Sequence, residues 1–429
     1  METLSTGPKK NIIVIGGSLS GLMHAILFKR HGHNVHILEA ASSARASHAA
    51  GITARDDVLE YMRLYDLTEE PWYINSPDTQ FINKSGARIR GFKKVLCMTS
   101  WSVLYHRLRA NFDGLESVFV KNVPGKVENE GRAIFEGGVR VADVVDVGKE
   151  VEVRVRDEHG SEERTMRADL VIAADGSNSF IRHKMLPEIQ TKYSGYVAFR
   201  GCVPQNAVSE KTLATFIDKL TIFKGSNPKS YILLYNIPDD AKGNLTPGSQ
   251  LLNYVWYWNV PQSELPNLMT DIHGHTHRNM LPIGLIRPEI WDVQLAHARS
   301  LLPPPFIEVI EKTTQPFVAL VNEHMSTRAS FFDSKMLLVG DALSLFRPHV
   351  ALSTNQAARH CLGLKKVMDG EMSLRAWEGD ALRYAKATGL LSVVVGNFGQ
   401  NGIGKLILSV VRYLICIVGQ KISWLWRKN

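Results

Sequence analysis

The chain has 429 residues, of which 45% are hydrophobic and 21% charged, an ordinary globular composition with room for two or three domain-sized units. The net charge of +8 is confined to one end, because seven basic and no acidic residues follow Asp380, and this excludes a general nucleic-acid-binding surface. The four scattered cysteines form no CxxC pair and no secretory signal is evident, so we expect no disulfide framework or structural zinc site and a reducing, cytoplasmic location.

The first predicted unit is a strand, a glycine-rich turn, a helix and a second strand over residues 12–39, the layout of a dinucleotide-binding βαβ motif. Gly16 permits the tight turn, Ser18 is small enough to let a pyrophosphate approach the backbone, and Gly21 lets helix and strand pack closely. Glu39, at the end of the second strand, can accept hydrogen bonds from a ribose and would repel a 2′-phosphate. FAD or NAD is therefore favoured over NADP at this site.

The middle of the chain changes from alternating strands and helices to a β-rich, aromatic block over residues 186–295. The predicted fold class is α/β, with a Rossmann-like FAD-binding domain, an inserted β-rich substrate domain and a helical C-terminal tail. We assign residues 1–80, 99–185 and 296–370 to the FAD-binding domain, 81–98 and 186–295 to the substrate sheet, and 371–429 to the tail.

Two later segments repeat the pattern of a buried strand that ends in an acid and leads into a helix. They are residues 169–182, DLVIAADGSNSFIR, and 336–357, MLLVGDALSLFRPHVALSTNQA. Each places a carboxylate, Asp175 or Asp341, at the carboxyl end of a strand, where open α/β sheets bind their ligands. Alone, either could be an aspartate capping a helix, but three such ends in this order favour a flavin site.

The chain resembles the single-component FAD-dependent aromatic hydroxylases, and within them the branch typified by 2,6-dihydroxypyridine 3-hydroxylase. The resemblance spans residues 11–400 and rests on segments such as GGSLSGL, AAGITARDDVLEYM, TSWSVLYHRLR, ADGSNSFIR and VGDALSLFRPHVALSTNQAA. It implies that Glu39 binds the adenosine ribose, that Asp341 contacts the ribityl chain, and that Asp175 belongs to a segment that touches both FAD and the nicotinamide cofactor. It also places Arg107 near the flavin phosphates and Pro348 and Ala351 beside the isoalloxazine, with Gly51 as a further cofactor-binding candidate.

The resemblance implies a reaction in which NADH or NADPH reduces FAD and O2 forms a flavin C4a-hydroperoxide. That species would hydroxylate or epoxidise an electron-rich aromatic or heteroaromatic small molecule. The chain departs from the family in two places. Ala351 and Ser353 replace the glycines of a P-x-x-G-x-G motif, for which we expect a shifted flavin, and Trp101 replaces an arginine common at the start of its helix.

Arg200 and Tyr235 are catalytic candidates on predicted strands of the inserted sheet, where they could orient or deprotonate a substrate. His349, next to Pro348, is a candidate proton shuttle. The alternatives are a structural ion pair, a core tyrosine and an exposed loop histidine. Tyr254, Trp256 and Trp258 share one face of a strand and are either core residues or the wall of an aromatic pocket.

Two alternative functions are kept open. The stretch from Trp256 to Pro261 resembles a WxWxIP signature of flavin-dependent halogenases, and the altered flavin loop would also suit a non-redox ligand-binding or cyclase-like descendant of the fold. The HGHTH stretch at His273, His275 and His277 invites a metal hypothesis, but no further ligands complete a site, and we expect a turn without metal.

The tail over residues 404–426 combines an apolar body with Trp424, Trp426 and basic residues. Its uninterrupted apolar stretch is too short to span a bilayer, which takes about 20 residues. It is either a helix packed on the FAD-binding domain or across a homodimer, or an interfacial helix that gives peripheral membrane contact.

Overall fold

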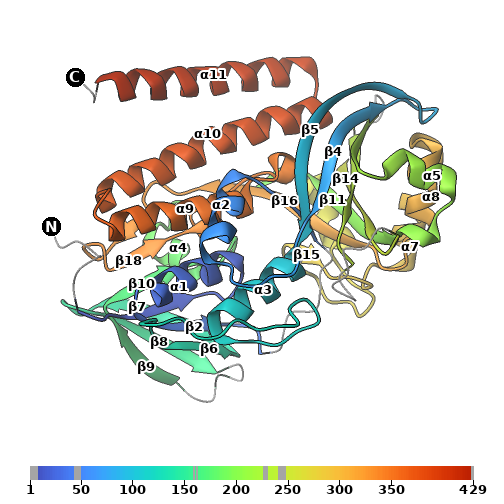
Figure 1. The fold of residues 1–429 in the computed structure, drawn as a ribbon. Coiled ribbons are helices and arrows are strands. Elements are labelled where there is room, and N and C mark those ends of the chain that lie inside the picture. Colours follow the sequence, from blue (N-terminus) through green and yellow to red (C-terminus); the bar gives the residue numbers. More distant parts are fainter. Residues whose placement is uncertain are drawn as a thin grey trace.

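The computed structural model describes residues 8–42, 50–157, 160, 163–225, 230–239 and 248–426. They form two units placed side by side, a parallel sheet covered by helices and a larger antiparallel sheet, and two long C-terminal helices run across one side of the molecule (Figure 1).

The first sheet has six strands within the described residues, in the order β17-β18-β10-β1-β2-β6. Their bounds are β1 Asn11–Ile15, β2 Asn34–Glu39, β6 Ala133–Gly137, β10 Leu170–Ala173, β17 Ser330–Phe331 and β18 Met336–Leu338. Strands β2, β1, β10 and β18 pair in parallel, so their carboxyl ends lie at one edge of the sheet. All residues of β10 and β18 are buried, as expected for strands covered on both faces.

Helices cover this sheet. They are α1 Leu19–Arg30, α2 Asp56–Tyr65, α3 Trp101–Asp113, α4 Phe180–Met185 and α9 Ser353–Met368. Helix α1 packs against both α3 and α9, so its residues Leu19 to Lys29 are buried apart from Ser20. A small antiparallel sheet, β7 Val139–Asp146, β8 Val151–Asp157 and β9 Glu163–Ala168, completes the unit. The predicted α/β fold class with a Rossmann-like domain is confirmed.

The second sheet has ten strands within the described residues, and its main path runs β15-β16-β11-β14-β13-β12-β4-β5-β3. The bounds are β3 Gly51–Ala54, β4 Ile74–Ile82, β5 Arg88–Ser100, β11 Lys192–Pro204, β12 Lys219–Gly225, β13 Ser230–Ile237, β14 Leu251–Asn259, β15 Met280–Leu281, β16 Phe317–Met325 and β19 Ser344–Leu345. Strands β3 and β16 and most of β4 lie in ranges that the sequence assigned to the FAD-binding domain. The chain therefore crosses between the two units more often than the predicted boundaries imply.

The face of this sheet that points away from the first unit carries a second core. Trp256, Phe216 and Phe306 are fully buried in it. The helices over this part of the molecule are α5 Glu210–Phe216, α6 Leu265–Leu268, α7 Pro288–Leu301 and α8 Pro304–Glu311. Short 3₁₀ turns occur at η1 Gln205–Ala207, η2 Gln262–Glu264, η3 Gly340–Ala342 and η4 Pro348–Val350.

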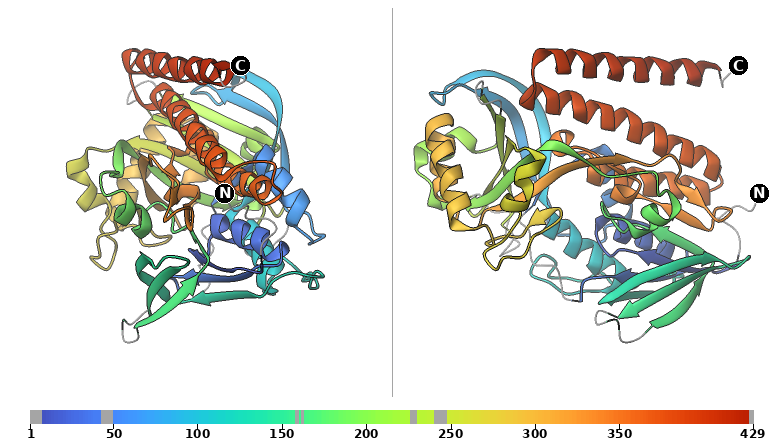
Figure 2. Two further views of the ribbon diagram at one scale, coloured as in Figure 1. Left: turned by 90° about the vertical axis from the view of Figure 1, so that its left-hand side faces the viewer. Right: turned by 180° about the vertical axis from the view of Figure 1, so that it is seen from behind.

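The chain ends in a helical hairpin. Helix α10, Leu374–Gln400, lies over α9 and η4, and α11, Ile403–Trp426, folds back along α10 on the outside of the molecule (Figures 1 and 2). The predicted helical tail is therefore two helices.

Candidate active site

Three strand ends far apart in sequence meet at the edge of the parallel sheet. Gly16, after β1, has a φ of +101°, and a Cβ placed on it would lie 2.4 Å from the carbonyl oxygen of Ala174, after β10. A Cβ on Gly340, after β18, would lie 2.5 Å from Oγ of Ser20 in α1. Because these contacts leave no room for side chains, the loops of all three motifs are in direct contact.

The glycine loop and Glu39 form one hydrogen-bonded unit. The amide of Gly17 donates to Glu39 Oε2 at 2.7 Å, and the amide of Ala41 donates to Oε1 at 3.0 Å. Glu39 is buried, at 6% exposure, so its carboxylate is held in one orientation. A Cβ on Gly21 would lie 1.8 Å from the Gly16 carbonyl oxygen, which explains why the helix needs glycine there.

Trp101 contacts the glycine loop directly. Its indole Nε1 donates to Ser18 Oγ at 3.2 Å, and its ring stacks on Tyr105 with centroids 4.6 Å apart. Ser18 caps α1 without using its side chain on the helix, so the hydroxyl is free to receive this bond. The residue that replaces the family arginine thus orders the loop through an uncharged donor.

Arg107 pairs with the end of α2. Its Nε donates to Asp66 Oδ2 at 2.8 Å and its Nη2 to the Thr68 carbonyl at 3.2 Å, and the side chain is 1% exposed. These contacts tie α3 to the segment after α2. The expected contact with flavin phosphates stays a prediction.

The second and third motifs are tied together by Arg182, for which the sequence suggested no role. Its Nη2 donates to the Ser177 carbonyl at 2.8 Å and its Nη1 to the Ala342 carbonyl at 3.2 Å. Beside it, Asp175 Oδ2 accepts a bond from the Ile181 amide at 3.1 Å, while Oδ1 has no hydrogen-bond partner among the described residues. Burial raises the pKa of Asp175, partly offset by its hydrogen bonds.

Asp341 lies in the turn after β18 with its side chain near Ser353, the first residue of α9. Burial raises the pKa of Asp341 to about 6, and a hydrogen bond from Ser353 opposes the rise. The turn is held by backbone contacts that the sequence did not reveal. His324 Nε2 bonds to the Asp341 carbonyl at 2.9 Å, and Gln356 Nε2 donates to the Gly340 carbonyl at 3.1 Å.

In the loop between Asp341 and α9, an alanine adopts a backbone conformation that is typical of glycine. Ala351 has a φ of +51°, in the left-handed region that glycine adopts without strain. Pro348 begins the short turn η4 just before it. Ala351 therefore adopts a backbone conformation that favours glycine.

His349 points into a cluster of tyrosines. Its Nε2 bonds to the Tyr196 hydroxyl at 2.6 Å, its Nδ1 bonds to the Tyr231 hydroxyl, and the Tyr257 ring centroid is 4.4 Å from its own. Burial and then the charge of Arg347 lower the pKa of His349 to about 3. A neutral imidazole with both nitrogens engaged is placed to fix the loop against the sheet.

Arg200 and Tyr235 lie on the same face of the large sheet as this tyrosine cluster. Arg200 is opposite Val255 and Tyr235 opposite Asn253, so both strands aim alternate residues toward the first unit. Burial raises the pKa of Tyr235 to about 12, and the charge of Arg200 opposes that rise. A Cβ on Gly51 would lie 2.6 Å from the Tyr235 hydroxyl, so β3 passes directly over this group.

The face is continued by residues that the sequence reasoning missed, Tyr196, Tyr231 and Tyr257. The positions of Tyr196 and Tyr231 could have been predicted from the sequence. Tyr196 is four residues before Arg200 and Tyr231 is four residues before Tyr235, and this even spacing puts each pair on one face of its strand. Tyr254 and Trp256 point the other way into the second core. They are core residues, so the WxWxIP-like stretch has a packing explanation.

The HGHTH segment folds as a loop organised by Asp271. That carboxylate accepts bonds from the amides of His273 and His275 at 2.8 and 2.9 Å, and contacts His277 Nε2 at 2.7 Å. Among the residues that the structure describes, no group of three or more potential metal ligands is found.

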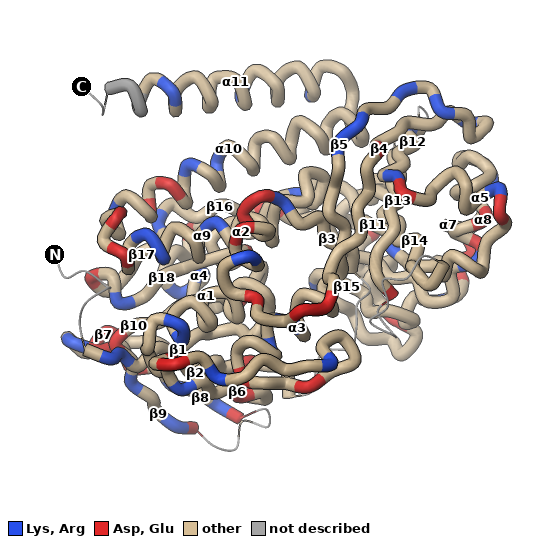
Figure 3. The backbone as a smooth tube through the Cα atoms, in the orientation of Figure 1, with Lys and Arg blue, Asp and Glu red and all other residues tan. Residues whose placement is uncertain are grey.

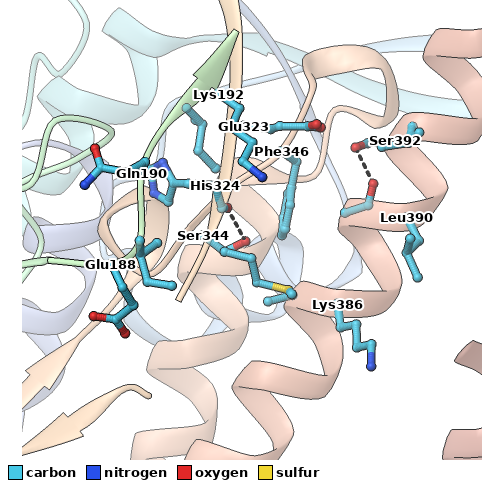
Figure 4. Close-up of a pocket in the computed structure, with 16 residues that line it drawn as sticks. Glu188, Gln190, Lys192, Glu323, His324, Ser344, Phe346, Lys386, Leu390 and Ser392 are labelled. Carbon is cyan, nitrogen blue, oxygen red and sulfur yellow. Dashed lines mark hydrogen bonds between the residues drawn. The ribbon is translucent and has the colours of Figure 1, made fainter. Parts of the chain in front are cut away.

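A cavity of about 390 Å³ lies beside the third motif, between β16, β19 and α10 (Figure 4). His324, Ser344 and Phe346 line one side and Lys386 and Ser392 of α10 the other. Arg200, Tyr235 and His349 do not line it.

Known proteins match along the whole of this arrangement. A model of the FAD binding domain family matches residues 9–199, and one described as FAD binding domain-like matches residues 193–323. The 2,6-dihydroxypyridine 3-monooxygenase of Paenarthrobacter nicotinovorans is 26% identical over 387 residues, 88% of each chain. The chain is similar to the FAD-dependent aromatic hydroxylases, and these matches identify it as an FAD-dependent monooxygenase.

Solved structures of other proteins share this fold. The structure of 2,6-dihydroxypyridine-3-hydroxylase from Arthrobacter nicotinovorans matches with a TM-score of 0.77 at 23% identity, over 93% of this chain and 95% of that one. Klebsiella pneumoniae HpxO, complexed with FAD and uric acid, matches with a TM-score of 0.66 at 17% identity, over 98% and 96%.

The residues of this monooxygenase fit FAD as its cofactor. The glycine at position 16 allows the tight turn against Ala174, and the start of α1 presents backbone amides that suit a pyrophosphate. Glu39 is held ready for a ribose, and the unpartnered Oδ1 of Asp175 is a buried acceptor.

Proposed function

We propose that the protein hydroxylates or epoxidises an electron-rich aromatic or heteroaromatic small molecule, with NADPH or NADH and O2 as co-substrates. The observation that supports this most is the position of the third motif. Its His349 packs against the sheet face that carries Tyr257, Tyr235 and Arg200. An aromatic face with one guanidinium, set against a flavin motif, suits a planar ring with an acidic hydroxyl.

The cofactor is held by the first unit and the substrate by the sheet face. Glu39 would hold the adenosine ribose, Asp341 the ribityl chain and the residues from Pro348 to Ala351 the ring system. When bound and reduced, FAD supplies the activation of O2 and the transfer of one oxygen atom. The relative named 2,6-dihydroxypyridine 3-monooxygenase acts on a pyridine ring by its name, which favours a heteroaromatic substrate.

Each residue of the sheet face has a role that follows from its charge state. Tyr235, with a pKa of about 12, is a neutral hydrogen-bond donor at physiological pH. Arg200 has an Nε without a hydrogen-bond partner among the described residues, and its guanidinium would bind and stabilise a substrate oxyanion. His349 is a positioning residue that fixes the flavin loop through Tyr196 and Tyr231.

The test is turnover by the purified, FAD-loaded chain with panels of phenols, pyridines and indoles. We expect substrate-stimulated oxidation of NADPH or NADH and a product that carries one atom from ¹⁸O₂. Arg200→Met should raise KM for ionisable substrates at least tenfold, since hydrogen bonds to charged groups contribute about 1.5–3 kcal/mol. The matched control is Trp256→Phe, in the second core, which should leave KM unchanged. Absence of nicotinamide oxidation with every substrate would overturn the proposal.

The alternatives are separated by the same assay. A halogenase would require halide for product formation, and a ligand-binding descendant would consume neither nicotinamide nor O2. We place the enzyme in the cytoplasm, which its four free cysteines fit.

A further inference from the structure

Helix α11 has its more apolar side on the outside. The side chains that face α10 include Ser409, which is 4% exposed, and Gln420, whose Nε2 donates to the Arg383 carbonyl at 3.0 Å. The large apolar side chains point to solvent, with exposures of 72% at Ile403, 57% at Ile407, 52% at Leu408, 46% at Val411, 54% at Leu414, 67% at Ile415, 54% at Val418 and 50% at Ile422. This is the reverse of a helix that belongs to a soluble core.

The basic residues of α11 border the apolar side. With about 100° of rotation per residue, the eight exposed apolar residues span an arc of about 140°. Lys405 and Arg412 fall just beyond one edge of that arc, and Lys421 falls at the other edge. Long basic side chains at the borders of an apolar arc can reach lipid headgroups while the arc contacts acyl chains.

Strand β5, on the same side of the molecule as α11, also exposes apolar side chains beside basic ones. The exposed part of β5 presents Ile89, Phe92 and Val95, with exposures of 66%, 51% and 60%. Residues 79–100 contain five basic and no acidic residues, although two of the five, Arg88 and Lys93, form ion pairs with Asp78 of β4. In all three views the outer end of β4 and β5 rises to the level of α11, and Figure 3 shows its basic residues there (Figures 1, 2 and 3).

We propose that α11 and the outer part of β5 form a docking surface for an anionic lipid bilayer, with α11 lying in the plane of the interface. Charge complementarity identifies the partner, because no acidic residue follows Asp380 and none lies in residues 79–100. Polybasic segments are attracted to anionic leaflets, and exposed apolar side chains insert beside the headgroups.

The contacts of α11 favour lying on the membrane over crossing it. The expectation that the tail is too short to span a bilayer is wrong by length and composition alone, because the helical stretch Ile403–Ile422 has 20 residues and a mean hydropathy of 1.6. However, both ends of the helix are bonded to α10, through Gln420 at one end and through Asn397 Nδ2 to the Lys405 carbonyl at 3.2 Å at the other. Insertion would break these bonds and leave Ser409 and Gln420 in hydrocarbon.

The experiment is co-sedimentation of the FAD-loaded full chain with phosphatidylcholine vesicles, with and without phosphatidylserine. We expect binding that needs phosphatidylserine and is released by high salt. The triple variant Ile407→Gln, Val411→Gln, Ile415→Gln should abolish it. The variant Lys405→Gln, Arg412→Gln, Lys421→Gln should weaken it about 100-fold, since each basic residue contributes about 1 kcal/mol and 1.4 kcal/mol is tenfold.

The matched control changes three exposed apolar residues elsewhere, Val118→Gln, Ile272→Gln and Val293→Gln, and should bind vesicles like the unchanged chain. Unchanged NAD(P)H oxidation shows that each variant is folded. The proposal is overturned if the unchanged chain stays in the supernatant, or if both apolar triples lose binding equally. A carbonate-resistant pellet would instead show a spanning helix, and a solution dimer disrupted by the first triple, without vesicle binding, would show a self-association surface.

Discussion

Glu39→Ala should weaken FAD binding about 10- to 150-fold. The carboxylate is held by two backbone amides, at 2.7 and 3.0 Å, and is placed to receive a ribose hydroxyl. A hydrogen bond to a charged group contributes about 1.5–3 kcal/mol, and each 1.4 kcal/mol changes the dissociation constant tenfold. The assay is titration of apoprotein with FAD, followed by the change in flavin fluorescence.

The same change also removes bonds within the apoprotein, because the amides of Gly17 and Ala41 lose their acceptor. Chemical unfolding of the apoprotein measures this separately, and we expect a loss of about 1–3 kcal/mol. Glu39→Gln is the matched control, since it keeps one acceptor oxygen. Its free energy of unfolding and its FAD dissociation constant should lie between those of the unchanged chain and of Glu39→Ala. Equal dissociation constants for the unchanged chain and Glu39→Ala would refute the assignment of this residue to the cofactor.

Four further outcomes are expected. Gly21→Ala should prevent FAD binding, because its Cβ would lie 1.8 Å from the Gly16 carbonyl, whereas Gly404→Ala, with open space around it, should leave the FAD dissociation constant unchanged in the same titration. Arg107→Met should destabilise the apoprotein by about 3–5 kcal/mol in urea unfolding, since it strands Asp66 in a buried pair. Ala351→Gly should raise the melting temperature, because about 1 kcal/mol of left-handed strain is relieved. Folding raises the pKa of Asp341 to about 6, so the folded state binds the proton of this carboxyl more tightly than the unfolded state. The free energy of unfolding, measured relative to Asp341→Asn, should therefore fall as the pH rises from about 4 to about 6. Urea unfolding at several pH values measures this, and a difference that does not change with pH would contradict it.

The cofactor unit was readable from sequence because its signals are local. The turn at Gly16, the acid at Glu39 and the buried strand before Asp175 can each be recognised from a few consecutive residues. The role of Arg182 could not be predicted from the sequence, since its hydrogen-bond partner Ala342 is 160 residues away and comes close to it only in the folded chain.

The sheet face proposed to bind the substrate was only partly predicted from the sequence. Arg200 and Tyr235 were chosen as residues on predicted strands, whereas Tyr254 and Trp256 were left open as core residues or a pocket wall, and the structure places them in the second core. A strand shows which residues share a face but not which face meets the neighbouring unit, because that depends on the helices packed later onto the sheet. The placement of β3 and β16 in the large sheet could not be predicted for a similar reason, since most strands of that sheet lie far away in sequence.

The meeting of three strand ends sets an order of events for the newly made chain. The FAD-binding edge needs β1, β10 and β18, which begin at Asn11, Leu170 and Met336, so it cannot close until most of the chain has been synthesised. Contacts between such distant segments form late, after loop-closure entropy has been overcome. FAD therefore stabilises only the completed fold, and supply of the cofactor should govern how much newly made protein survives.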